Sequence, residues 1–175
     1  MANEKITHGA YLVIEKLLRW CVNPYLRAFL LRLLGARIGR NARIYEIQLF
    51  NLTRGFKNLV VEDDAHIGPG VMLDLSDKII IKKGAVLSTR TLILTHSDPG
   101  SHHKSPLCKI YPPKTMPVEI GAYSWIGAST VILCGTKTGN YSVVGAGSLV
   151  NADIPANTLA CGVPAKVLKE NILTL

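Results

Sequence analysis

Residues 120–155 read IGAYSW-IGASTV-ILCGTK-TGNYSV-VGAGSL-VNADIP, six consecutive units of six residues. An aliphatic residue or Thr opens every unit, and Gly follows it in four of the six. A small residue stands at the fifth place of each unit except the last, which has Ile154 there. A helix needs apolar residues about 3.6 apart and a free-standing strand about 2 apart, so a period of six fits neither.

Fixed short repeats of this kind are typical of a parallel β-helix, in which each unit supplies one short strand and one turn. We expect the opening side chain to point into the coil and the small fifth residue to fill the narrow corner. The Gly at the second place is expected to permit the tight turn.

The same period runs upstream with interruptions. Its openers there are Ile38, Ile44, Val61, Ile67, Leu73, Ile81, Leu87 and Ile93. The phase moves by two residues after Leu73, and the count fails for the 27 residues from Ile93 to Ile120. Three units make one turn of a three-sided coil, so we expect about five to six turns between Ile38 and Pro155. Residues 97–117 are then a loop extruded from the coil, and its five prolines argue against regular structure inside it.

Composition fits one compact domain. The chain has 175 residues, of which 48% are hydrophobic and 18% charged, so it can bury a sizeable core. Its four cysteines are scattered without the spacing of a metal site or a disulfide framework. The N-terminus begins polar and lacks a cleavage site after an apolar run, so a signal peptide is not expected. We therefore expect reduced thiols and a cytoplasmic protein.

The net charge of +8 is concentrated before the repeats, where residues 1–57 hold ten Lys and Arg against three Asp and Glu. Residues 10–21 have the pattern of an amphipathic helix. A second helix is expected from Pro24 to Leu34, capped by Asn23 and stopped by Gly35, and it is too short to cross a bilayer.

Two interpretations of this front end remain open. In the first, the N-terminal segment packs on the first open turn of the coil and caps it. In the second, residues 10–37 touch the inner face of a membrane. In the second case the apolar contacts would be Leu26, Phe29, Leu30, Leu33 and Leu34, and the contacts to anionic lipid Arg19, Arg27, Arg32 and Arg37. Nucleic acid is disfavoured, because the basic segment lacks interleaved aromatics and any known reading motif.

His96 is the first candidate for chemistry. It stands at the fourth place of the unit opened by Ile93, so its ring should point outward over the base of the loop. A neutral imidazole can remove a proton from a hydroxyl or an amine. Asp74 and Asp98 are the candidates to orient this ring or bind an acceptor, although each is also typical of an ordinary turn. Tyr111, on the loop, is a candidate for lining an acceptor pocket.

Residues 59–169 resemble the hexapeptide-repeat acyltransferases, a left-handed β-helix group that includes galactoside, maltose and polysaccharide-assembly acetyltransferases. The resemblance rests on the order and separation of Ile120-Gly121, Trp125-Ile126-Gly127, Val144-Gly145-Ala146-Gly147-Ser148, Asp153-Ile154-Pro155 and Cys161-Gly162-Val163-Pro164-Ala165-Lys166-Val167. Leu94-Thr95-His96-Ser97-Asp98 stands where the family keeps its catalytic histidine. The resemblance implies left-handed winding and a homotrimer with each active site between neighbouring coils.

The same resemblance implies roles for single residues. His96 would deprotonate the acceptor for attack on the thioester of acetyl-CoA. Trp125, Ala128 and Ala146 match cofactor-binding positions. Asn151 stands where the family often has Thr, and Ala152 replaces a Lys that commonly meets a CoA phosphate. Lys166 and Lys169 could supply that contact, or they belong to an ordinary solvated tail.

The sequence thus predicts an all-β repeat protein, a left-handed parallel β-helix over 38–165 with the loop 97–117. An N-terminal helical segment, 1–37, precedes the coil and a C-terminal tail, 166–175, follows it. The predicted function is O-acetyl transfer from acetyl-CoA to a sugar-like or glycan-precursor acceptor, without a metal. N-acetyl transfer to an amino sugar or amino acid and a non-catalytic scaffold remain alternatives. A γ-carbonic-anhydrase-like zinc site is disfavoured, because the position five after His96 is Ser101.

Overall fold

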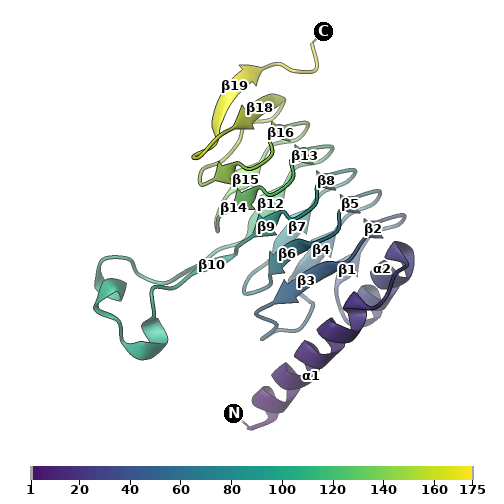
Figure 1. The fold of residues 1–175 in the computed structure, drawn as a ribbon, viewed down its shortest axis with the longest axis vertical. Coiled ribbons are helices and arrows are strands. Elements are labelled where there is room, and N and C mark those ends of the chain that lie inside the picture. The colour runs from purple at the N-terminus through teal and green to yellow at the C-terminus, as the bar shows by residue number, and fades with distance from the viewer. Residues whose placement is uncertain (1, 175) are drawn as a thin grey trace.

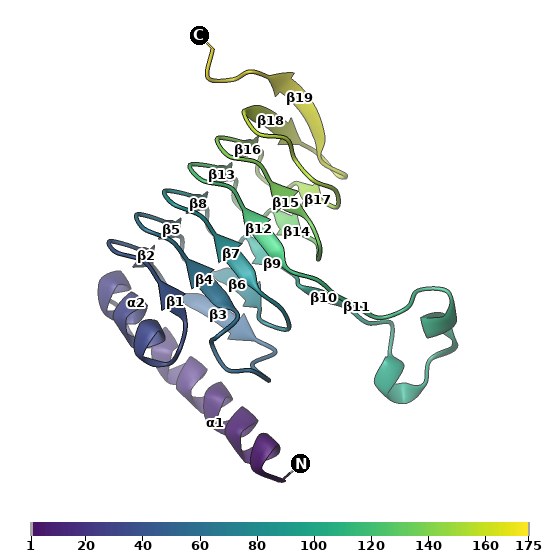
Figure 2. The same cartoon turned by 180° about the vertical axis from the view of Figure 1, so that it is seen from behind.

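A computed structural model describes the backbone of residues 2–174 and the side chains of residues 9–174. The chain forms a three-sided parallel β-helix with two helices at its first turn and one loop standing off its side (Figure 1). The helices are α1 (Ala2–Arg19) and α2 (Pro24–Leu33). The view from behind shows the helices at the first turn of the coil and the loop leaving its side near the middle of its length (Figure 2).

Three sheets form the faces of the coil. The first face contains β1 (Arg37–Ile38), β4 (Leu59–Val61), β7 (Ile79–Ile81), β12 (Val118–Ile120) and β15 (Lys137–Thr138). The second face contains β2 (Arg43–Ile44), β5 (His66–Ile67), β8 (Val86–Leu87), β13 (Trp125–Ile126), β16 (Val143–Val144), β18 (Thr158–Cys161) and β19 (Lys166–Glu170). The third face contains β3 (Ile47–Phe50), β6 (Val71–Asp74), β9 (Leu92–Ile93), β14 (Val131–Ile132) and β17 (Leu149–Val150).

These strands make five full turns and part of a sixth, as predicted. All pairs within the faces are parallel except the last, in which β19 runs antiparallel to β18. Part of the expected C-terminal tail is therefore a strand, which pairs residues 166–170 with the end of the coil.

The core is the column of opening residues. From Val61 to Val150 every predicted opener is 2% exposed or less, and equivalent openers of successive turns are paired across the sheets. The small residues at the fifth place are buried at the corners. Most of their hydroxyls donate to the carbonyl three residues earlier, as in Thr136 to Leu133 and Ser142 to Gly139, both at 2.8 Å, while Thr130 donates to Gly145 of the next turn at 3.2 Å. Each buried hydroxyl therefore has a partner.

The Gly after the opener acts differently from our expectation. A Cβ built on Gly127 would lie 2.5 Å from the backbone nitrogen of Ala146 in the next turn. The left-handed corner positions are held by other residues, among them Tyr123, Ser129 and Tyr141. Gly is needed at the second place because adjacent turns stack too closely for a side chain.

The two helices pack on the first turn, α2 along β1 and β2 and α1 along β3. The side-chain oxygen of Asn23 accepts from the backbone N–H groups of Tyr25 and Leu26, with Pro24 at the first helical position, as predicted. Gly35 follows the helix with a φ of +101°. The first helix is longer than predicted and ends earlier, at Arg19, since the N–H groups of the next two residues donate only three residues back.

A buried arginine joins the two helices to the coil. Arg27 is 2% exposed, and its guanidinium donates to the carbonyls of Leu18, Cys21 and Ile44. Burial lowers the pKa of Arg27. This residue is unavailable to lipid, which corrects its predicted role in a membrane contact. Among the described residues, neither helix has the length and apolar character needed to cross a membrane.

The loop leaves the coil on a two-stranded stalk. β10 (His96–Ser97) pairs antiparallel with β11 (Lys114–Thr115), and the coil resumes at Val118. Beyond the stalk lie the 3₁₀ helices η1 (Ser101–His103) and η2 (Pro106–Lys109). The prediction of no regular structure is therefore wrong in part. Pro106 opens η2, a position where its missing N–H needs no partner.

Candidate active site

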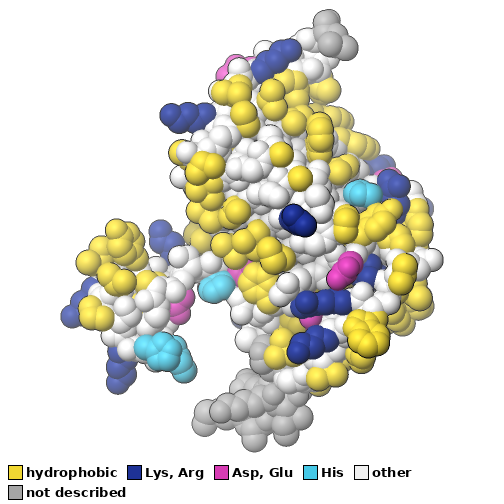
Figure 3. Space-filling view, in the orientation of Figure 1, with side chains coloured by type: hydrophobic (Ala, Val, Ile, Leu, Met, Phe, Trp, Pro, Cys, Tyr) yellow, Lys and Arg dark blue, Asp and Glu magenta, His cyan; other side chains and the backbone are white. Residues whose placement is uncertain are grey.

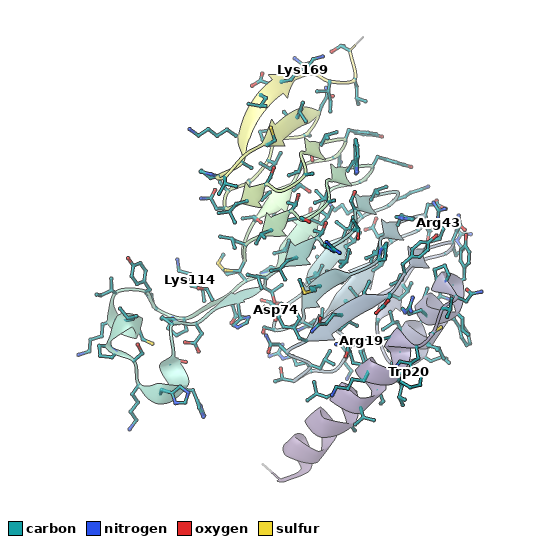
Figure 4. The ribbon with its side chains drawn as sticks, viewed as in Figure 1. Arg19, Trp20, Arg43, Asp74, Lys114 and Lys169 are labelled. Atoms are coloured by element: carbon teal, nitrogen blue, oxygen red, sulfur yellow. The ribbon has the colours of Figure 1, made fainter. Side chains whose placement is uncertain are left out.

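His96 is the first residue of the stalk, and its side chain is 36% exposed. Its Nδ1 lies 2.5 Å from Oδ2 of Asp74, the last residue of β6 in the preceding turn. Figure 4 shows Asp74 at the base of the extruded loop, on the side of the coil from which Lys114 projects. Two residues that are 22 apart in the sequence thus meet through the stacking of β6 and β9.

The Asp74 carboxylate is fully buried and surrounded by donors. Its Oδ1 accepts from Asn51 Nδ2 at 2.9 Å and from both the N–H and the hydroxyl of Ser76 at 3.0 and 2.8 Å. Its Oδ2 accepts from the N–H groups of Thr95 and His96 at 2.9 and 3.0 Å, in addition to the imidazole. Burial is the strongest influence and raises the pKa of Asp74. The hydrogen bonds from His96, Asn51 and Ser76 outweigh it and lower that pKa to about 2.

An ionised carboxylate is an acceptor only, so the imidazole Nδ1 must carry the hydrogen in this contact. We assign the tautomer on that basis. The other ring nitrogen, Nε2, then keeps its lone pair and is able to accept a proton. The arrangement of Asp74 and His96 is that of a general base held by an orienting carboxylate.

Asn51 belongs to this site and was missed by the sequence analysis. It follows β3, has a φ of +57°, and places Nδ2 3.5 Å from His96 Nδ1 as well as against Asp74. The available signal was the failure of the six-residue count between Ile44 and Val61, where Asn is one of the few residues that tolerate a left-handed conformation.

A surface hollow of about 310 Å³ lies beside the histidine. It is lined by Leu94, His96, Ser97, Lys114, Met116, Leu133, Cys134 and Asn151. Of the predicted cofactor-binding residues, Asn151 is the one that lines this hollow. Its walls are partly aliphatic, with an amide, a hydroxyl and an ammonium group beside the imidazole.

The other predicted cofactor-binding residues lie elsewhere on the coil. Trp125 is on the second face, 54% exposed, with Nε1 donating to Ser88 Oγ at 2.9 Å. Ala128 and Ala146 stack at the corner between the second and third faces. Lys166 and Lys169 are exposed on β19, again on the second face. Within one chain, these residues and His96 occupy different sides of the coil.

Asp98 and Tyr111 are both on the loop. Asp98 accepts from the N–H groups of Gly100 and Ser101 at 2.9 and 2.7 Å and from the Ser101 hydroxyl. The hydrogen bonds from Ser101 are the main reason that the pKa of Asp98 is lowered. The imidazole donates its hydrogen bond to Asp74, while Asp98 holds the turn that leads into η1. Tyr111 follows η2 and is 66% exposed.

Across the residues that the structure describes, no group of three or more His, Cys, Asp and Glu side chains is arranged to hold a metal ion.

Comparisons with known proteins place the chain in a family. No protein-family model matches it. The Escherichia coli K12 protein named for colanic acid biosynthesis, acetyltransferase WcaF, is 35% identical over 161 residues, which cover 91% of this chain and 80% of the relative. Among solved structures, a hexapeptide-repeat acetyltransferase from Vibrio cholerae has a TM-score of 0.78 at 22% identity, covering 98% of this chain and 94% of that one.

A galactoside acetyltransferase in complex with coenzyme A has a TM-score of 0.69 at 26% identity, covering 93% of this chain and 82% of its own. The fold of these structures is the left-handed β-helix that the resemblance implied. Because a relative above 30% identity is covered over four-fifths of its length, this chain belongs to the hexapeptide-repeat, left-handed β-helix family of acetyltransferases.

Proposed function

We propose that the protein is an acetyl-CoA-dependent O-acetyltransferase in which His96 is the general base and Asp74 orients it. One observation carries this proposal: a buried carboxylate that is held ionised lies 2.5 Å from Nδ1 of an imidazole on the surface of the coil. Buried carboxylates without this many donors protonate instead, so the site is built to keep a negative charge behind the histidine.

The mechanism follows from these positions. Bound acetyl-CoA supplies an acetyl group activated as a thioester. His96 Nε2 takes the proton of an acceptor hydroxyl while that oxygen forms its bond to the thioester carbonyl carbon. The carbon–sulfur bond then breaks, and His96 gives the proton to the departing sulfur. Asp74 stabilises the imidazolium between these steps. General base help of this kind contributes about 10² to 10⁴ in rate.

We propose that the active site lies between two copies of the chain in a homotrimer. His96, Asp74 and Asn151 of one copy would face Trp125, Ala128 and Ala146 of its neighbour. The support is the separation of these two sets on different sides of a single coil. An exposed indole on the second face is suited to packing against the pantetheine arm or the adenine of CoA.

Lys166 and Lys169 are our candidates for the CoA phosphates. Both are exposed on β19, the last strand of the second face, which is also the face that carries Trp125. They would replace the family Lys that is Ala152 in this chain. Two ammonium groups on a short strand are suited to phosphate oxygens as point charges.

Complementation between inactive variants tests the shared site. His96→Ala and Trp125→Ala are purified separately, mixed one to one, and allowed to exchange subunits. If each site takes its imidazole from one chain and its indole from the next, random trimers regain about a quarter of the wild-type rate. Capture of untagged chains by affinity-tagged ones is the control for exchange. If exchange is verified and the mixture stays inactive, either both residues belong to the site of one chain or they do not have the proposed roles.

The proposed acceptor is a sugar-like or glycan-precursor hydroxyl. The relatives are named for colanic acid biosynthesis and for galactoside, and the hollow offers Ser97, Lys114 and Asn151 to a ligand rich in hydroxyls. Tyr111, exposed on the loop, is the candidate for an additional acceptor contact. Release of CoA thiol with a panel of sugars, nucleotide sugars and amino sugars tests the class. If wild type and His96→Ala release CoA thiol equally with every acceptor, the proposed mechanism is refuted.

We propose the cytoplasm, beside the inner face of a membrane, as the place of action. All four cysteines are free thiols, as expected in a reducing compartment. The basic charge of the front end is suited to an anionic leaflet.

A further inference from the structure

The two N-terminal helices have an apolar face where a solvated helix is normally polar. The side chains turned away from the coil on α1, in the α1–α2 turn and on α2 are Leu12, Val13, Leu17, Trp20, Val22, Tyr25, Leu26, Phe29 and Leu33, each at least 40% exposed. Trp20 and Val22 are 85% and 90% exposed. We call this set the α1–α2 apolar face. Nine exposed apolar side chains on two neighbouring helices, with Leu17 and Leu33 lining one groove, indicate an interaction site.

A groove between the helices continues this face. It has a volume of about 320 Å³ and is lined by Ile14, Leu17, Leu18, Leu30, Leu33 and Leu34. Leu17 and Leu33 belong to both the groove and the exposed face. The groove walls are aliphatic throughout, so an occupant that fits them is a hydrocarbon.

Basic residues outnumber acidic ones around the face. The exposed Glu46 lies near Arg19 and Arg27, and Glu62 and Asp63 line one hollow together with Arg32 and Arg37. Residues 9–44 contain seven Lys and Arg and a single acidic residue, Glu15. The carboxylate of Glu15 is buried and bonded to Arg19 at 2.8 Å, so it gives no exposed negative charge. The exposed cations near the helices are Lys16, Arg32, Arg37, Arg40 and Arg43, of which Arg40 is paired with Asp63. Figure 3 shows basic and apolar side chains side by side at the lower right, and Figure 4 places Trp20 and Arg43 on that same side.

We propose that the α1–α2 apolar face docks on an anionic lipid surface. The helices would lie in the plane of the interface, with the apolar face at the headgroup–acyl boundary and the cations at lipid phosphates. A second copy that met this face with its own equivalent face is a poorer occupant, because such a pair would bring cations against cations. An anionic bilayer neutralises these charges while it covers the carbon surface.

This inference deepens the proposed location beside a membrane, by naming the surface that docks, and it does not depend on His96. Its consequence for the acceptor rests on the proposed function: a docked enzyme would meet glycan precursors that are carried on lipids. The chemistry of the site is unchanged by docking, so binding and catalysis are separable in experiment.

Vesicle co-sedimentation of the full chain tests the proposal. The probes are neutral phosphatidylcholine vesicles and vesicles with about 30% phosphatidylglycerol. Wild type is expected to bind the anionic vesicles at least tenfold more tightly than the neutral ones, and less tightly at high salt. The double variant Phe29→Ser/Leu33→Ser removes two exposed apolar side chains and is expected to lose this binding. The charge variant Arg37→Glu is expected to weaken it by severalfold without altering the apolar face.

The matched control is Leu107→Ser/Ile110→Ser, which removes two equally exposed apolar side chains from the loop. It is expected to bind vesicles like wild type. Thiol release with a soluble acceptor should stay within about twofold of wild type for the helix variants, which separates failure of docking from failure of catalysis. Wild type that does not sediment with anionic vesicles overturns the proposal. A smaller assembly of the helix variant by light scattering also overturns it, because the face would then belong to a second copy.

Discussion

Replacing Asp74 by Asn is the substitution that tests the candidate site most directly. Six donor contacts converge on the two oxygens of this carboxylate, three on each. An amide has one acceptor oxygen and one NH₂ group, so one of these two sets must face a second donor. The Asn side chain is nearly the same size as that of Asp. The effect of the substitution therefore comes from the position of the imidazole hydrogen and from the hydrogen bonds that can no longer form.

If the NH₂ group takes the place of Oδ2, it meets the N–H groups of Thr95 and His96 and forces imidazole Nδ1 to become the acceptor. The hydrogen then moves to Nε2, and the base loses its lone pair. We expect kcat to fall by about 10² to 10⁴, the usual contribution of general base catalysis. The KM for acetyl-CoA should change little, because Asp74 is buried behind the histidine.

The same substitution costs stability. Leaving two or three buried donors unpaired costs about 1–3 kcal/mol each, so a loss of about 3 kcal/mol or more in the free energy of unfolding is expected. Thermal unfolding and CoA thiol release are therefore measured on the same preparations. Assays are run at a temperature where the variant is folded, so that the fall in kcat reports chemistry.

Asp98→Asn is the matched control, since Asp98 is an exposed carboxylate two residues beyond His96 that bonds within the loop. It should keep kcat within about twofold of wild type. A folded Asp74→Asn enzyme with kcat within threefold of wild type would refute the orienting role. A large fall in the Asp98 variant with a small one in the Asp74 variant would reverse the assignment.

Three further results are expected. Asn51→Ala should lower kcat about tenfold with little change in KM, while Asn41→Ala, which removes an equivalent bond to Asp64 at another left-handed Asn, should not. Arg27→Leu should lower the free energy of unfolding by about 2 kcal/mol in urea and expose the helices to protease, whereas Arg43→Leu, at an exposed position, should not. The depressed pKa of Asp74 adds stability above pH 4 that is lost as the pH falls toward 2, about 2 kcal/mol in an acid titration, and Asp74→Asn should lack this loss.

The regular part of this molecule could be predicted because its physics is local and repeated. Every turn of the coil needs an aliphatic residue at the same place and a small residue at the corner. The same residue pattern therefore recurs in each unit and can be recognised in the sequence. The position of His96 was predictable for the same reason, since counting from Ile93 gives the direction of its side chain. The catalytic role of His96 was predicted from the family motifs, because the six-residue period carries no information about chemistry.

The partners of His96 were harder to predict. Asp74 and Asp98 looked equivalent in sequence, and only the stacking of β6 on β9 brings one of them to the imidazole. The broken six-residue count marked the segment that holds Asn51 but did not give its role, because that role depends on a contact with a residue 23 positions away. The reason for Gly127 was also mistaken, because the distance between two turns is a property of the assembled coil.

The three residues of the site share one place in the fold. Asn51, Asp74 and His96 each lie at or just after the end of a strand of the third face, β3, β6 and β9, in three successive turns. The six-residue count breaks at each of these places. A corner that keeps the count has room only for a small buried residue, so a side chain able to bind, orient or accept a proton requires an interruption. The repeats thus build the scaffold, and their interruptions, aligned along one edge, build the candidate active site.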